Sequence, residues 1–76
     1  VRVEVDRDNK VYVGNKKAET YKEILDLLTA EKTANSSVND LDLILDPDST
    51  HEMRVTVIDA ATQAGFLRVK NRIQEL

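Results

Sequence analysis

Residues 41–70 carry the pattern that most limits how this chain can fold. Every second residue of Leu41–Leu45 is a leucine, which is the period of a strand that buries one face. A helical segment follows from about Ser49, and Leu67–Lys70 then alternates apolar and basic residues. A strand, a helix and a second strand connected in this way form a crossover that is almost always right-handed. The two strands are therefore expected to be parallel, with the helix on one face of their sheet.

The first 18 residues predict three short antiparallel strands. Val1–Asp6 alternates apolar and charged residues, and the turn formers Asp6–Asn9 separate it from the β-favouring Val11–Val13. Gly14 and Asn15 then form a two-residue hairpin loop, because glycine tolerates the positive φ that such turns require. A third strand follows this loop.

Two helices are expected, and each begins with the spacing of a capping box. Thr20 and Glu23 mark the start of the first helix, and Ser49 and Glu52 mark the start of the second. Gly65 lies where a left-handed C-cap ends the second helix. The apolar stripes are Tyr21, Ile24, Leu25, Leu27 and Leu28 in the first helix, and Met53, Val57, Ala60, Ala61 and Ala64 in the second.

These elements predict one α+β domain over residues 1–76, in the order β-β-β-α-β-α-β. Its small mixed sheet has about five strands, and both helices pack on one face. The residues expected to be most buried are Leu25, Leu28, Leu43, Leu45, Val57, Ala61 and Val69. On the other face we expect acidic and basic side chains of neighbouring strands to lie opposite one another, namely Asp42 and Asp46 against Arg68, Lys70 and Arg72.

Composition excludes several classes of protein. The chain has no cysteine, so a disulfide, a thiolate metal site and a cysteine nucleophile are all excluded. A net charge of −3 argues against nucleic-acid binding, which usually needs a basic excess. No apolar run approaches the ~20 residues of a membrane-spanning helix. Because the chain starts at Val1, we expect it to be part of a longer protein.

No constellation of residues predicts catalysis or a bound metal. His51 is the only histidine, and Asp46, Asp48 and Glu52 lie near it in sequence. A single imidazole without a convergent set of carboxylates makes a poor zinc site, so His51 is better interpreted as a solvent-facing residue of the first helical turn. No serine has a base to activate it, and two glycines cannot form a phosphate-binding loop. We therefore predict no enzymatic activity, no cofactor and no metal.

The last strand is the candidate interaction site. A strand at the edge of a sheet presents unpaired N–H and C=O groups, to which another extended chain can add as a further strand. Few residues follow this segment, so little is left to cover its outer side. The candidate residues are Leu67, Arg68, Val69, Lys70, Asn71 and Arg72. The opening hairpins supply an alternative edge, and basic residues can also serve only to keep an edge soluble.

Two stretches together resemble a known family. The first is Val11–Ala18 followed by the first capped helix. The second is Leu43–Asp48, the helix that carries Val57–Ala60, and the sequence Gln63–Phe66 before the last strand. Over nearly the whole chain this resembles the periplasmic domain of the ExbD/TolR family of bacterial envelope proteins. Two departures are His51–Met53, where the family often has an aromatic followed by a small residue, and the polar Lys70–Arg72.

The resemblance implies a function in a membrane motor. The full-length protein would be anchored by one transmembrane helix, with this domain on the periplasmic side of the inner membrane. It would be a homodimer within a proton channel of the ExbB/TolQ type. An ExbD-like subunit uses the proton motive force to energise TonB for active transport across the outer membrane. ExbD is favoured by the hairpin at Gly14 and by the Gln63–Phe66 ending.

Three alternatives to an ExbD-like subunit remain open at this stage. A TolR-like subunit would act through TolA in envelope maintenance and engage peptidoglycan. A small cytosolic α+β domain that binds a ligand or nucleic acid belongs to a different class, and an enzyme fragment to a third. A transmembrane helix with an aspartate before Val1 would favour the ExbD and TolR interpretations over the other two.

Overall fold

The chain begins with three antiparallel strands, as the sequence predicts. In the computed structural model, which describes residues 1–76, these are β1 (Arg2–Val5), β2 (Val11–Val13) and β3 (Lys16–Ala18). Val3 pairs with Val13 and Val5 with Val11, so the valines of β1 and β2 share one face. Gly14 has a φ of 62° in the turn between β2 and β3, which confirms the predicted hairpin.

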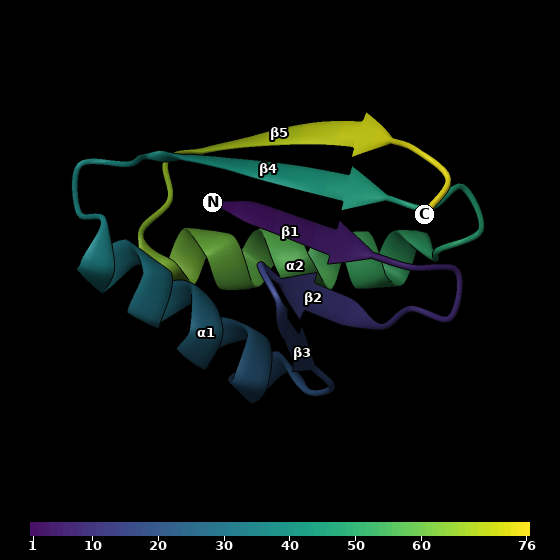
Figure 1. Cartoon of the computed structure of the whole chain (residues 1–76), viewed down its shortest axis with the longest axis horizontal. Coiled ribbons are helices and arrows are strands. Elements are labelled where there is room, and N and C mark those ends of the chain that lie inside the picture. Colours follow the sequence, from purple (N-terminus) through teal and green to yellow (C-terminus); the bar gives the residue numbers. More distant parts are fainter.

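The predicted crossover forms the other half of the sheet (Figure 1). Strand β4 (Asp40–Leu45), helix α2 (His51–Ala64) and strand β5 (Arg68–Ile73) follow one another along the chain. β4 is parallel to both of its neighbours, β1 and β5. The strand order is therefore β3-β2-β1-β4-β5, a mixed sheet in which β3 and β5 are the two edges.

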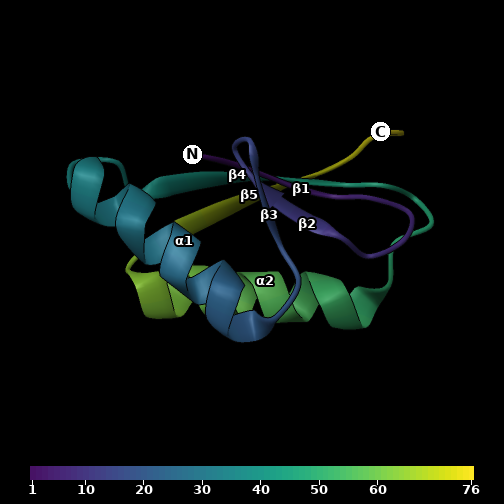
Figure 2. The ribbon, with the colours of Figure 1, turned by 60° about the horizontal axis from the view of Figure 1, so that its bottom comes forward.

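Both helices cover the same face of this sheet, as predicted. Figure 2 shows α1 (Tyr21–Ala34) and α2 together on one side of the strands. The Tyr21 hydroxyl at the start of α1 donates a hydrogen bond to Asp59 Oδ2 of α2 over 2.8 Å. Between the helices and the sheet lies a core of buried side chains: Val3, Val5, Val11, Val13, Ala18, Ile24, Leu28, Leu41, Leu43, Leu45, Val57, Ala60, Ala61 and Phe66.

The helix ends follow their local sequence, with one correction. The Thr20 hydroxyl accepts a hydrogen bond from Glu23 N, which confirms the first cap. At α2 the cap is Thr50, which accepts from Met53 N, and the prediction of Ser49 was wrong by one residue. The Ser49 hydroxyl instead donates to the backbone oxygen of Asp46. Gly65 adopts the predicted left-handed conformation, with a φ of 104°.

Burial agrees with the predicted core except at two positions. Leu25 and Val69 are only partly buried, because each lies at the border of the packed layer and not at its centre. Leu67 precedes β5 and is 77% exposed, although it was expected to be part of the last strand. Ile44 is 1% exposed but does not belong to the core cluster, because its side chain points away from those of Leu43 and Leu45 toward the other face.

The charges of the open face agree with the prediction at Asp42, which lies next to Lys70 by register, but not at Asp46. Asp40 Oδ1 lies 2.6 Å from Arg68 Nε, and Asp40 Oδ2 lies 3.7 Å from Lys70 Nζ. Asp40 is therefore the carboxylate that pairs with the basic residues of β5. Asp46 is buried and does not form an ion pair with them. Its side chain accepts hydrogen bonds from Asp48 N and Leu76 N, which hold the turn after β4 and the last residue of the chain.

Candidate protein-docking edge

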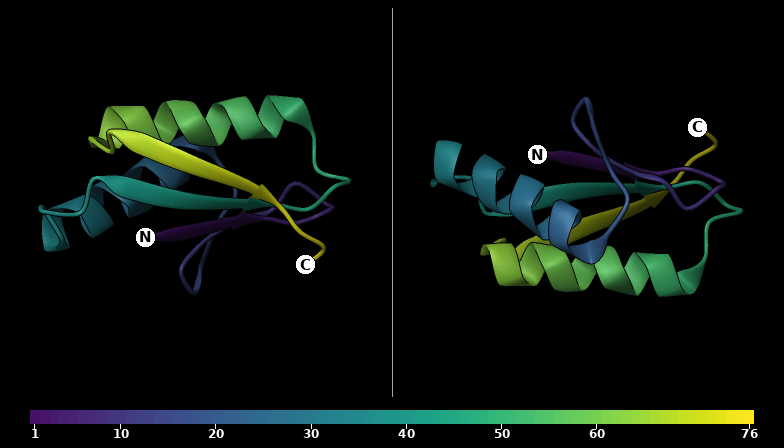
Figure 3. Two further views of the ribbon diagram at one scale, coloured as in Figure 1. Left: turned by 90° about the horizontal axis from the view of Figure 1, so that it is seen from above. Right: turned by 90° about the horizontal axis from the view of Figure 1, so that it is seen from below.

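Strand β5 is an uncovered edge of the sheet. Its neighbour on one side is β4, and no strand lies on the other side. The left view of Figure 3 looks onto this edge, and β5 lies in front with α2 beside it. The sequence predicted that the last strand is an edge, and the strand order confirms this position.

The backbone of β5 divides into a bonded side and a free side. Arg68 N donates to Asn39 O over 3.1 Å, and Gln74 N donates to Leu45 O over 2.9 Å. Alternate residues of a parallel strand direct both their N–H and their C=O groups to the same neighbour. Even-numbered residues of β5 therefore bond to β4, and Val69, Asn71 and Ile73 present their backbone groups to solvent.

Basic side chains line the open face beside this free backbone. Arg68, Lys70 and Arg72 lie by register next to Asp40, Asp42 and Ile44 of β4, and Arg68 and Arg72 are exposed. Asp40 neutralises part of the charge of Arg68 and Lys70, whereas Arg72 forms no ion pair. The β5 edge is thus locally basic on a chain whose net charge is −3.

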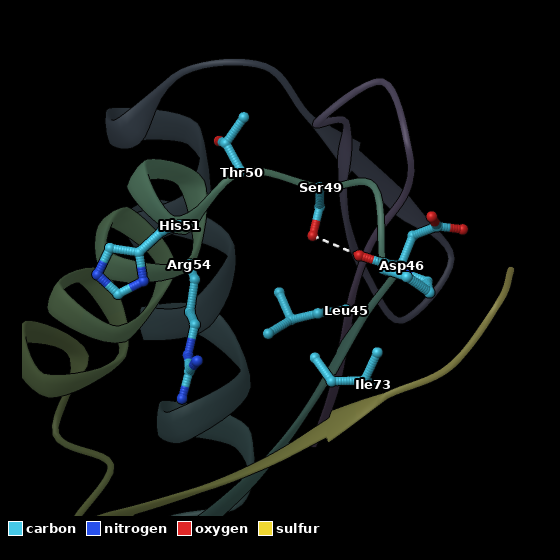
Figure 4. A pocket seen from close by; sticks show the side chains of 8 residues that line it. Leu45, Asp46, Ser49, Thr50, His51, Arg54 and Ile73 are labelled. Carbon is cyan, nitrogen blue, oxygen red and sulfur yellow. Dashed lines mark hydrogen bonds between the residues drawn. The ribbon is translucent and has the colours of Figure 1, made fainter.

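A small hollow lies at the end of the free edge. It has a volume of about 170 Å³ and is formed where β4 and β5 end and α2 begins. Figure 4 shows Leu45 and Ile73 on one side of the hollow and His51 and Arg54 on the other. Its lining also includes Asp46, Pro47, Ser49 and Thr50.

The polar groups of this hollow differ in whether they are already bonded. Asp46 accepts two backbone hydrogen bonds, and the Ser49 hydroxyl donates to Asp46 O over 2.7 Å (Figure 4). His51 and Arg54 form no ion pair. The backbone N–H of Asp48 holds the pKa of the Asp46 carboxyl below its ordinary value, although burial opposes this shift. The hollow therefore has an acid that is already bonded, and two basic side chains without an acidic partner.

A second hollow of about 270 Å³ lies on β4 and β5, lined by residues 42–44 and 70–72. Its basic lining residues, Lys70 and Arg72, belong to the predicted interaction site. Both hollows of the molecule thus border β5.

The structure brings most of the predicted interaction residues together and adds others. Residues 68–72 all belong to β5, whereas Leu67 lies before it. Sequence reasoning did not include Arg54 and Ile73 in the site. The signal for Arg54 was weak, since a basic residue one turn into a helix is common, and only the crossover places it beside the end of β5.

No group of three or more histidine, cysteine, aspartate or glutamate side chains lies close enough to hold a metal ion. His51 is exposed at the start of α2, as predicted. Neither helix has the length and apolar character of a membrane span. Comparison with models of protein families and with curated proteins found no match.

Proposed function

We propose that this chain is the periplasmic domain of an ExbD-like subunit of a motor complex in the bacterial inner membrane. The motor is driven by the proton motive force and transmits energy to TonB for active transport across the outer membrane. The observation that carries the proposal is the free β5 edge. A domain that transmits force has to hold an extended partner along its length, and a row of unbonded backbone groups does this by adding the partner as a strand.

The residues of the resemblance support this assignment. Asp46 follows β4, and Gln63–Phe66 forms the end of α2 together with its left-handed cap. The ordered series of a strand, an acidic residue, a helix and this ending is what resembles the family. In the proposed function the domain is anchored to the membrane in the full-length protein and works beside a channel subunit of the ExbB type.

The resemblance also implies a homodimer, and the sheet has a second edge that could serve it. β3 pairs only with β2, so its outer side is free for a second copy, and Glu19 directly after it neutralises part of the charge of its lysines. Two separate edges would allow the domain to dimerise and to bind its partner at the same time.

A domain exchange tests the proposal. The periplasmic domain of an ExbD protein is replaced by this chain, and TonB-dependent growth on a scarce iron chelate is measured. Restored growth supports the proposal, provided that immunoblots show the chimera at the parental level. A chimera that is present at that level but inactive contradicts it.

The same exchange in a TolR protein separates the two members of the family. Restored resistance to detergent in that strain, without restored TonB-dependent growth, replaces the ExbD proposal with the TolR alternative. Failure of both chimeras at normal protein levels favours a small binding domain of another class.

A further inference from the structure

The hollow at the end of β5 gives the docking edge a place to select its partner. Ile73 belongs both to the free backbone side of β5 and to the lining of the hollow. A strand added to β5 lies about 4.8 Å away, and alternate side chains of that strand project to the same face as Ile73. One of these side chains would therefore lie over the hollow, between Ile73 and the start of α2.

The groups that surround this position favour an acidic side chain. Leu45 and Ile73 supply an apolar wall, and Ile73 is 61% exposed. Arg54 and His51 supply donors without an acidic partner, while the only carboxylate of the lining, Asp46, is held by backbone hydrogen bonds. A glutamate fits both features, because its methylene groups can contact Ile73 while its carboxylate accepts hydrogen bonds from Arg54.

The edges of a second copy of this chain do not offer that chemistry. Antiparallel pairing of β5 with another β5 would bring Arg68, Lys70 and Arg72 against the same basic residues. Pairing with β3 would bring them near Lys16 and Lys17. Like charges on facing strands destabilise a pair, so the charge of β5 favours a different partner.

We infer that β5 binds an extended acidic segment of a partner protein, and that His51 and Arg54 hold one glutamate of that segment in the hollow. The inference rests on the proposed function only in its use of β5 for docking. It can be tested on this chain alone, so its failure is separable from failure of the chimeras.

The probe is a fluorescein-labelled, capped peptide of about ten residues in which pairs of glutamates alternate with pairs of threonine and valine. It is long enough to cover β5 as a strand, and its glutamates then project to both faces. A matched peptide has lysine in place of glutamate. Fluorescence anisotropy measures binding of each to this chain. We expect the glutamate peptide to bind and the lysine peptide to bind at least about tenfold more weakly, as the loss of a charge-assisted hydrogen bond predicts.

Three variants assign the binding to the edge and the hollow. Arg54→Gln should weaken binding about tenfold, which is the effect of removing one charge-assisted hydrogen bond. Asn71→Pro should abolish binding, because the ring occupies the free side of β5 without removing a bond to β4. Lys16→Gln, on β3, changes the net charge equally and should leave binding unchanged.

Circular dichroism and urea unfolding establish that each variant folds. The inference is overturned if both peptides bind equally, if neither binds, or if Lys16→Gln weakens binding as much as Arg54→Gln does. It is also overturned if a folded Asn71→Pro variant binds like the parent. Concentration-dependent self-association through β5 would identify a second copy as the occupant instead.

Discussion

Asn9 and Thr50 are joined by hydrogen bonds although they lie 41 residues apart in sequence. Asn9 Oδ1 accepts a hydrogen bond from Thr50 N over 2.8 Å and a longer one from the Thr50 hydroxyl over 3.3 Å. Asn9 is also the only residue other than glycine with a positive φ, at 61°. The turn between β1 and β2 is thereby attached to the start of α2, which borders the hollow at the end of β5.

Two replacements of Asn9 should separate the contribution of its side-chain hydrogen bonds to stability from the cost of its positive φ. Asn9→Gly keeps the positive φ accessible but loses the hydrogen bonds, and should lower the free energy of unfolding by about 1 kcal/mol. Asn9→Ala loses the same hydrogen bonds but, like the parent, keeps a Cβ in the left-handed region, so it should be about 1 kcal/mol less stable than the Gly variant. Urea unfolding measures both. Equal stability of the Ala variant and the parent, which both keep the Cβ, would show that the side-chain contact contributes nothing.

Lys32 should stabilise the connection between α1 and β4. Its ammonium group donates hydrogen bonds to Ser36 O, Val38 O and Asn39 Oδ1, and it lies 5.7 Å from the centre of the Phe66 ring. Lys32→Met retains the apolar stem but loses these donors, and should lower the free energy of unfolding by about 1–3 kcal/mol.

Lys22→Met is the matched control for Lys32, since Lys22 is an exposed residue of the same helix. Urea unfolding of the two variants should give a clear loss for Lys32→Met and little change for Lys22→Met. Equal midpoints for the two variants would contradict a stabilising role of Lys32.

Local periodicity was sufficient to predict the elements and their order. Alternation predicted β1 and β4, and the hydroxyl and carboxylate spacing predicted where α1 begins. At α2 the same spacing, from Ser49 to Glu52, predicted a cap one residue before the observed cap Thr50. The contact of Thr50 with Asn9 depends on the folded sheet and has no local signal.

The candidate site was predictable only in part, for a similar reason. The sequence predicted the last strand as the candidate edge, with the opening hairpins as the alternative, and the strand order places β5 and β3 at the two edges. The hollow requires Arg54 of α2 to lie beside Ile73 of β5, and this proximity arises only after the crossover has formed. The hydrogen bond that Asp46 accepts from Leu76 N joins residues 30 positions apart in the chain, so it too has no local signal.

The contact between Tyr21 and Asp59 should be visible in the titration of the phenol. The hydrogen bond to Asp59 raises the pKa of Tyr21 above its ordinary value of 10.0. In a Tyr12→Phe background, Tyr21 is the one remaining tyrosine, and its ionisation can be followed by ultraviolet absorbance. Adding Asp59→Asn should move the pKa back toward 10.0. A pKa that Asp59→Asn leaves unchanged would show that this hydrogen bond is not the cause of the shift.

The hydrogen bond between Tyr21 and Asp59 also predicts that part of the stability of the fold is lost at alkaline pH. The pKa of Tyr21 is higher in the folded chain than in the unfolded chain. The stabilisation from its hydrogen bond is therefore fully present below pH 10.0, and it is lost as the pH rises through the pKa of Tyr21 in the folded chain. Tyr21→Phe should therefore be less stable than the parent at neutral pH, and the difference should narrow above pH 10.0. Urea unfolding at a series of pH values measures this difference, and a constant difference across the range would exclude the linkage.

Asp46 should make the fold sensitive to acid. Its carboxyl has a pKa below the ordinary value of 3.8, chiefly because Asp48 N donates to it, and Leu76 N and the charge of Arg7 act in the same direction. A lowered folded pKa stabilises the protein fully above pH 3.8, and this stabilisation is lost as the pH falls through the folded pKa. Asp46→Asn should therefore have a lower free energy of unfolding than the parent at neutral pH. On acidification its free energy of unfolding should fall by less than that of the parent.

Asp48→Asn is the control for this prediction, because it changes the same turn but keeps the backbone donor, and its stability should follow that of the parent. Urea unfolding between neutral and acidic pH measures all three proteins, and parallel pH profiles for the parent and Asp46→Asn would rule out Asp46 as the source of the acid sensitivity.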